Sequence, residues 1–203
     1  MSKKFYVKAL SAKRIYKKPI FILAMRAFIA CEVFHEGVGE VVEEIKKTGA
    51  DIKFVEAENT HVTLKFLGEI GDAAVEEVGR ALEESCAGMP PMVARLTGLG
   101  AFPNTGYVRV LWIGVICPEM EGLQRRLDDA LSRIGFRREK GFKMHLTIGR
   151  VRSARNKERL VEALRRRRDM EIGSVTIDAV KLKKSELTPK GPVYTDLKEV
   201  RLC

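Results

Sequence analysis

Two four-residue segments of the sequence share one order of residue types: histidine, an apolar residue, threonine, an apolar residue. They are His61-Val-Thr-Leu64 and His145-Leu-Thr-Ile148, and the chain contains only one further histidine. Both segments have the pattern of a β-strand, in which alternate side chains share a face. Each strand would therefore present one imidazole and one hydroxyl on a polar face, while its two apolar residues pack into a core.

These residue types suit acid–base chemistry on a phosphodiester. Because the ordinary pKa of histidine lies near 6.5, one imidazole can act as a base and the other as an acid near neutral pH. The hydroxyls of Thr63 and Thr147 can donate hydrogen bonds to the non-bridging oxygens of a phosphoryl group. No carboxylate cluster with metal-ligand spacing occurs near either segment, so we expect no metal and no other cofactor.

Longer segments around the two strands carry a resemblance to a known family. They are Arg26-Ala-Phe-Ile-Ala30, His61-Val-Thr-Leu-Lys-Phe-Leu-Gly68, Gly98-Leu-Gly-Ala-Phe-Pro-Asn104, Val110-Leu-Trp-Ile-Gly114, Phe142-Lys-Met-His-Leu-Thr-Ile-Gly-Arg150 and Ser185-Glu-Leu-Thr-Pro-Lys-Gly-Pro-Val-Tyr194. With these segments, from about Met25 to Leu202, the chain resembles the two-histidine (2H) phosphoesterase superfamily. More narrowly, it is similar to the RNA 2',3'-cyclic phosphodiesterases, long called 2'-5' RNA ligases.

The resemblance implies both a fold and a set of roles. The fold is α+β and two-lobed with pseudo-two-fold symmetry, and its antiparallel sheets line a central cleft with helices outside. His61 and His145 match the catalytic pair of the family, while Thr63 and Thr147 match its phosphate-binding threonines. Arg150 matches a phosphate-contacting arginine, whose guanidinium can bind two oxygens at once.

The spacing of two cations from the histidines leads to different expectations. Arg150 lies five residues after His145, so a flat strand would point it away from the phosphate. A bulge permitted by Gly149 would turn it back. Lys65 lies four residues after His61, and this even spacing predicts that it faces the phosphate as an auxiliary cation.

Two aromatic residues near the motifs have the spacing or setting of core residues. Phe66 shares its strand face with Leu64, so we expect it in the core rather than stacked on a base. We expect Trp112 in the core as well.

The remaining sequence predicts the elements that position these residues. We expect strands at residues 26–33, 52–55, 61–66, 93–99, 108–116, 145–151, 175–183 and 194–201, and helices at residues 36–47, 72–86, 118–134 and 156–168, with Asp72 as an N-cap. This order, with short strands and no Rossmann glycine pattern, predicts one α+β domain over residues 25–203.

Composition narrows the class of protein. The chain has 203 residues, of which 45% are hydrophobic and 32% charged, as in a globular protein. No apolar run reaches the ~18 residues of a membrane span. The four cysteines form no C-x-x-C pair, which favours a reduced, cytoplasmic protein, and we expect a monomer. Scarce Asn and Gln with abundant Lys, Arg and Glu are typical of a thermophilic source.

The net charge of +10 favours a polyanionic partner, but the charge is unevenly placed. Residues 1–24 contain seven Lys or Arg residues and no acidic residue. This segment is either a basic arm that contacts RNA or the product of a mis-assigned start before Met25, and the abrupt start of the first strand favours the second.

We therefore expect a metal-independent hydrolase that converts RNA 2',3'-cyclic phosphate ends to 2'-phosphates. The same site could act in reverse as a 2'-5' RNA ligase on tRNA halves. A rival from another class is a non-catalytic RNA-end binding module, which would bind with strong salt dependence and show no turnover. Small cyclic phosphodiesters, such as nucleotides or ADP-ribose cyclic phosphate, are further candidate substrates.

Overall fold

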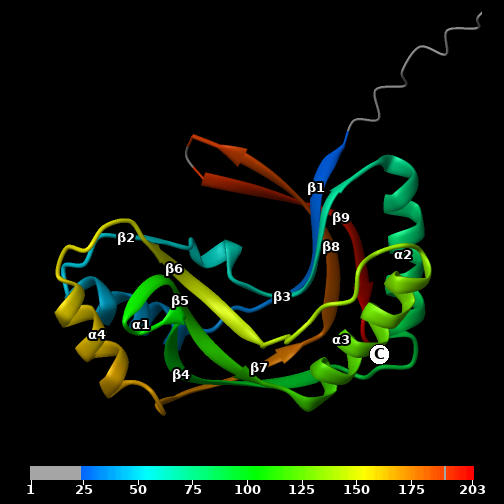
Figure 1. The fold of residues 1–203 in the computed structure, drawn as a ribbon. Coiled ribbons are helices and arrows are strands. Elements are labelled where there is room, and N and C mark those ends of the chain that lie inside the picture. Colours follow the sequence, from blue (N-terminus) through cyan, green and yellow to red (C-terminus); the bar gives the residue numbers. More distant parts are fainter. Residues whose placement is uncertain (1–23, 190) are drawn as a thin grey trace, which may run out of the picture.

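The computed structural model describes residues 24–189 and 191–203 (Figure 1). Most of the predicted basic segment, residues 1–23, lies outside these described residues. In chain order the elements are β1 (Met25–Glu32), α1 (Glu36–Lys46), β2 (Ile52–Phe54), the short 3-10 helix η1 (Ala57–Asn59), β3 (His61–Ile70), α2 (Asp72–Cys86), β4 (Met92–Asn104), β5 (Tyr107–Ile116), α3 (Pro118–Arg133), β6 (His145–Val151), α4 (Lys157–Arg166), β7 (Glu171–Ile177), β8 (Ala179–Thr188) and β9 (Gly191–Arg201).

The predicted helices and strands are present, with three local differences. Gly71, rather than Asp72, is the N-cap of α2. The strand predicted at residues 93–99 extends to Asn104, whose side chain accepts hydrogen bonds from the N–H groups of Gly106 and Tyr107 and closes a short hairpin with β5. The last predicted strand but one is divided at Asp178 into β7 and β8.

All strand pairings are antiparallel, and the strands follow the order β7-β4-β5-β6-β3-β1-β8-β9, with β2 paired to β6. Within the described residues, β3 and β6 are paired at one position only, Val62 opposite Leu146. This narrow junction divides the sheet into two halves. The α+β, two-lobed, antiparallel architecture expected from the sequence is confirmed.

The helices cover the two halves separately. Helix α2 packs on β8 and β9 and α3 packs on β3, and these two helices also pack against each other. Helix α1 lies against β7 and α4 against β4. Figure 1 shows α2 and α3 on one side of the molecule and α1 and α4 on the other. Each half of the sheet thus has its own helical cover, and the junction of β3 with β6 lies between them.

The core contains one face of α3, on which Met120, Leu123, Leu127 and Leu131 are fully buried. Three of the four free cysteines are also buried, and burial raises the pKa of the Cys86 thiol to about 11. These thiols therefore stay protonated near neutral pH. None of the described helices is long and apolar enough to span a membrane.

Candidate active site

The two His-x-Thr-x segments begin the two strands that meet at the junction of the sheet. Because Val62 lies opposite Leu146, the antiparallel register sets His61 opposite Thr147 and Thr63 opposite His145. Both apolar neighbours are buried, whereas the histidines and threonines are half-buried. Residues opposite each other in a sheet share a face, so all four polar side chains lie on one side of the junction.

Each histidine ring is held by the backbone two residues before it. The Nδ1 atom of His61 lies 2.7 Å from the carbonyl oxygen of Asn59, and that of His145 lies 2.7 Å from the carbonyl oxygen of Lys143. Since a carbonyl oxygen can only accept, Nδ1 must carry the hydrogen in both rings. In the neutral form, Nε2 of each ring then has a free lone pair, and in the charged form it can donate a proton.

Aromatic rings flank both histidines. Phe28 of β1 lies 5.0 Å from the His61 ring, and Tyr194 of β9 meets the same ring edge-on at 5.4 Å. Phe102 of β4 meets the His145 ring at 4.9 Å, again edge-on. These apolar walls limit the ring positions and exclude water from one side of each imidazole. All three aromatic residues occur in the segments that carried the resemblance, but nothing in their spacing indicated these contacts.

The surroundings of His61 favour its neutral form. Burial is the largest influence and lowers the pKa of His61, whereas the hydrogen bond to the Asn59 carbonyl raises it. Among nearby charges, Lys183 lowers this pKa and Glu32 raises it, and the net result is a pKa below the ordinary value of 6.5. Near neutral pH, His61 is therefore ready to accept a proton.

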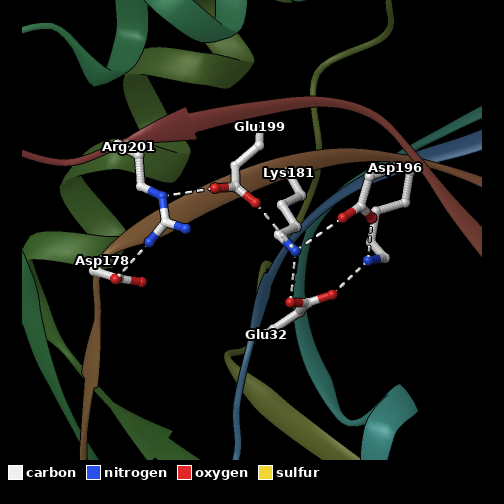
Figure 2. Close-up of polar contacts among 7 residues, drawn as sticks. Glu32, Asp178, Lys181, Asp196, Glu199 and Arg201 are labelled. Atoms are coloured by element: carbon white, nitrogen blue, oxygen red, sulfur yellow. Dashed lines mark hydrogen bonds and ion pairs between the residues drawn. The ribbon is translucent and has the colours of Figure 1, made fainter.

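The charges beside His61 belong to a network that joins β1, β8 and β9 (Figure 2). Glu32, which pairs with His61 in the β1–β3 register, bonds to Lys183 at 2.5 Å and to Lys181 at 2.8 Å. Asp196 bonds to both lysines, and Lys181 also reaches Glu199 at 3.2 Å. Partial burial alone would raise the pKa of Glu32, but the two lysines bring it below its ordinary value.

Arg150 lies on the same face as the histidines because β6 contains a bulge. Along β5, Trp112 pairs with Thr147 and the next residue, Leu111, pairs with Gly149, so one residue of β6 is skipped. Ile148 and Gly149 are both buried, and Arg150 is exposed on the other face, with Thr147. The bulge expected at Gly149 is present. Arg150 also lies near Tyr194. Burial raises the pKa of Tyr194, and the positive charge of Arg150 partly offsets this rise.

Lys65 does not face the phosphate, and the expectation that it does is wrong. A bulge in β3 also follows the threonine, because Ala30 pairs with Thr63 and Ile29 pairs with Lys65. Lys65 is therefore turned to the helix side, where it is 3% exposed. Its Nζ atom lies 2.5 Å from Asp128 of α3 and donates to the carbonyl oxygen of Arg137.

Because of the same bulge, the expectation that Phe66 lies in the core is also wrong. Its side chain is 68% exposed rather than in the core, and its ring lies 6.4 Å from that of Phe28. Trp112 is half-buried and shares the face of Thr147, with the Lys143 ammonium 4.2 Å from its ring centre. Trp112 packs closely on Gly100, where a Cβ atom would come within 2.1 Å of the indole. Phe66 and Trp112 thus belong to the polar side of the junction.

Within the part of the chain that the structure describes, no group of three or more His, Cys, Asp or Glu side chains is arranged to hold a metal ion. The residues gathered at the junction are instead imidazoles, hydroxyls and one guanidinium. This set can move protons and bind an anion, which are the two operations that transfer of a phosphoryl group to water needs.

Comparison with known proteins places the chain among phosphoesterases. A family model described as LigT-like phosphoesterase matches residues 30–112 and 116–194. A relative from Methanothermobacter thermautotrophicus is 39% identical over 89% of this chain and all of its own length. Another from Thermotoga maritima is 36% identical over 86% of this chain and 94% of its own. Both relatives carry the name RNA 2',3'-cyclic phosphodiesterase.

Two solved structures have the same fold. A protein of Thermus thermophilus superimposes with a TM-score of 0.74 at 27% identity, covering 88% of this chain and 98% of its own. E. coli LigT in complex with 3'-AMP gives a TM-score of 0.69 at 22% identity, with the same coverage.

Proposed function

Because the chain belongs to the LigT-like phosphoesterase family, we propose that it hydrolyses RNA 2',3'-cyclic phosphate ends to 2'-phosphates without a metal ion. The observation that carries the proposal is the register at the Val62–Leu146 pair, which sets two imidazoles and two hydroxyls on one face. The family model and the relatives confirm the two-histidine phosphoesterase resemblance found in the sequence, and the assignment of roles to single residues is our proposal.

The proposed reaction uses the two histidines as a base and an acid. The Nε2 atom of one takes a proton from a water molecule, and the water oxygen forms a bond to phosphorus. The bond from phosphorus to the 3' oxygen breaks, and the other imidazolium gives its proton to that oxygen. The product carries a 2'-phosphate and a free 3'-hydroxyl. Each histidine has changed its protonation state once, and proton exchange with solvent restores the pair.

The remaining polar groups bind the charge on the phosphoryl oxygens. Thr63 and Thr147 lie opposite the two histidines, so their hydroxyls can donate to the non-bridging oxygens from both sides. The guanidinium of Arg150 adds a charge-assisted, bidentate contact. Hydrogen-bond donors fixed in this way stabilise the transition state because their orientation needs no change during the reaction.

The substrates that this site suits are RNA ends, including tRNA halves, and small cyclic phosphodiesters. Net positive charge and the name shared by the relatives support RNA over the small molecules. Free thiols support a reduced, cytoplasmic setting for the protein, which we propose acts as a monomer.

The test replaces each histidine of the chain in turn. His61→Ala and His145→Ala should each lower turnover of an RNA 2',3'-cyclic phosphate at least about 100-fold, the scale of lost acid–base catalysis. The matched control is His35→Ala, since His35 caps α1 through Gly37 and takes no part in the proposed site. Circular dichroism checks folding. Near-wild-type turnover by a variant of His61 or His145 would contradict the mechanism, and RNA binding without any wild-type turnover would favour the binding module.

A further inference from the structure

The exposed Phe66 ring lies at the mouth of a cavity next to the proposed site. The cavity has a volume of about 390 Å³ and lies between residues 65–68 of β3 and residues 136–140, which follow α3. Its size is sufficient for a nucleotide. Phe28 connects the cavity to the site, because its ring lies 5.0 Å from that of His61 and 6.4 Å from that of Phe66.

The charge of its lining distinguishes this cavity from two other cavities, of about 400 and 260 Å³. Arg137, Arg138 and Lys140 line it, together with the ion-paired Lys65 and Glu139. Within the described residues, Arg137 and Lys140 have no ion-pair partner, whereas Arg138 is paired with Asp129. The cavity therefore offers two uncompensated cations beside an exposed aromatic ring.

The other two cavities do not offer this combination. The one at the base of the β8–β9 hairpin is lined by Arg26 and Lys184, but each is neutralised there, by Glu69 and Glu186 respectively. The cavity beside the charge network of Figure 2 is lined by three acidic and two basic side chains: Glu32, Asp178, Glu199, Lys181 and Arg201. An RNA strand, which is a polyanion, is favoured by neither of them.

The loop that forms the basic wall is held firmly in place. The Nζ atom of Lys65 lies 2.5 Å from the carbonyl oxygen of Arg137, and Asp128 accepts a hydrogen bond of 2.9 Å from the N–H of Glu139. Lys65 and Asp128 are themselves ion-paired and nearly buried. Further along the same loop, Lys143 lies two residues before His145, and its ammonium stacks over Trp112. The loop between α3 and β6 thus carries cations both at the cavity and near the second histidine.

The opposite end of the site is covered. The backbone of Gly191 approaches Lys53 so closely that a Cβ atom there would lie 3.2 Å from Nζ. Lys53 pairs with Arg150 in the β2–β6 register. Figure 1 shows the β8–β9 hairpin projecting from the sheet toward the side of β2. An RNA strand leaving past Arg150 would meet this hairpin, whereas the Phe66 side has an open cavity.

The two motifs are related by pseudo-symmetry, but they carry different residues at one equivalent position. Phe66 and Arg150 each lie five residues after a catalytic histidine, and a bulge after the threonine turns both toward the histidine face. The same position thus provides a guanidinium on one side of the junction and an aromatic ring on the other. The two equivalent positions therefore suit different parts of a substrate: Arg150 suits a phosphate group, and Phe66 suits a nucleobase.

We infer that Phe66, Arg137 and Lys140 form a subsite for a nucleotide on the 5' side of the cyclic end, with Phe66 stacked on its base. This inference rests on the proposed function and gives the site its preference for an RNA strand over a cyclic mononucleotide. Stacking on an aromatic ring tolerates any base, so the subsite should select RNA without selecting its sequence.

The test compares two substrates that share the same cyclic end: a nucleoside 2',3'-cyclic monophosphate and a six-nucleotide RNA ending in that nucleotide. Phe66→Ala should lower the ratio of kcat/KM for the RNA to kcat/KM for the mononucleotide about tenfold, the scale of one lost base stack. Phe66→Trp should keep the wild-type ratio. Arg137→Gln with Lys140→Gln should lower the ratio and make the salt dependence of RNA binding shallower.

Matched controls come from the two other cavities described above. Phe34→Ala removes another exposed aromatic ring, and Arg26→Gln with Lys184→Gln removes the paired cations; both should leave the ratio unchanged. The inference would be overturned if Phe66→Ala and the double variant Arg137→Gln with Lys140→Gln kept the wild-type ratio of kcat/KM values. An equal fall of this ratio in the control variants would also overturn it.

A binding measurement separates this inference from the proposed function. Fluorescence anisotropy with a labelled RNA that ends in a 2'-phosphate needs no turnover. If the wild-type protein hydrolyses neither substrate, the proposed function fails. Weaker RNA binding by the variants of Phe66 and of Arg137 with Lys140 would still support the subsite, and unchanged binding would overturn it.

Discussion

Val62 of β3 and Leu146 of β6 lie opposite each other and form the junction between the two halves of the sheet. Each is the residue between the histidine and the threonine of its motif. One backbone pairing therefore sets the relative positions of His61, Thr63, His145 and Thr147. The two-fold relation of the motifs passes through this pair, and we propose that the substrate phosphate binds on the histidine face above it.

The environment of His61 predicts its titration. Burial, Lys183 and His145 keep the pKa of His61 below 6.5, and NMR titration of the ring should show this directly. Lys183→Met should raise the value, because it removes a cation and leaves Glu32 with one lysine partner fewer. Lys198→Met, which breaks a surface ion pair with Glu83 on α2, is the control. A His61 pKa at or above 6.5 in the wild-type protein would refute this description.

The same shift predicts a dependence of stability on pH. Since the folded-state pKa of His61 lies below its unfolded value, the unfolded chain takes up a proton first as the pH falls. The contribution of His61 to the free energy of unfolding is therefore present above about pH 6.5 and lost as the pH falls toward the folded-state pKa. Urea unfolding at several pH values should show a smaller loss for His61→Asn than for the wild type. Equal slopes in this range would contradict the prediction.

Arg150 should contribute to phosphate binding rather than to stability. Arg150→Met should lower kcat/KM about 100-fold, as loss of one fixed oxyanion donor does, with little change in melting temperature. Arg150→Lys should recover part of the activity, because an ammonium keeps the charge but not the bidentate geometry. Arg159→Met on the exposed side of α4 is the control. An Arg150→Met variant with normal kcat/KM would remove Arg150 from the site.

Lys65 should contribute to stability through its buried pairing with Asp128. Lys65→Met leaves the Asp128 carboxylate without its main partner and should lower the free energy of unfolding by about 3 kcal/mol. The double variant Lys65→Met with Asp128→Leu should recover most of this loss, because no buried charge is left unpaired. Chemical denaturation of the wild type, Lys65→Met, Asp128→Leu and the double variant measures the coupling between the two residues. Unchanged stability in Lys65→Met would argue against a stabilising role of the Lys65–Asp128 ion pair.

The limits of the sequence prediction follow from how the two strands continue beyond the threonine. Alternation correctly placed His61, Thr63, His145 and Thr147 on one face, because both strands are regular up to that point. Each strand then contains a bulge, which reverses the alternation. In the second motif Gly149 signalled the bulge. In the first motif no glycine marks it, so both Lys65 and Phe66 were placed on the wrong face.

Other features depend on contacts between distant parts of the chain. The partners of Lys65 come from α3 and the loop after it, and Lys183 meets Glu32 only because β8 pairs with β1. Such long-range contacts cannot be predicted from the local sequence pattern. The type and approximate range of each helix and most strands were predictable because the apolar periodicity is local, whereas the charge network and the aromatic walls depend on register.

The ion-pair network beside the site predicts high thermal stability. Lys181 and Lys183 are shared among three carboxylates, and such networks gain importance as the temperature rises. With the scarcity of Asn and Gln and the relatives from Methanothermobacter and Thermotoga, this favours a melting temperature above about 65 °C. Scanning calorimetry tests it, and a value in the ordinary mesophile range would count against a heat-adapted protein.

The most direct measurement is incubation of the purified protein, in EDTA, with an RNA oligonucleotide that ends in a 2',3'-cyclic phosphate. Chromatography that separates 2'-phosphate from 3'-phosphate ends identifies the leaving oxygen. We expect complete conversion to the 2'-phosphate at a rate that EDTA does not change. Activity that EDTA abolishes, a 3'-phosphate product, or no conversion of the cyclic end would contradict a metal-independent reaction driven by the His61–His145 pair.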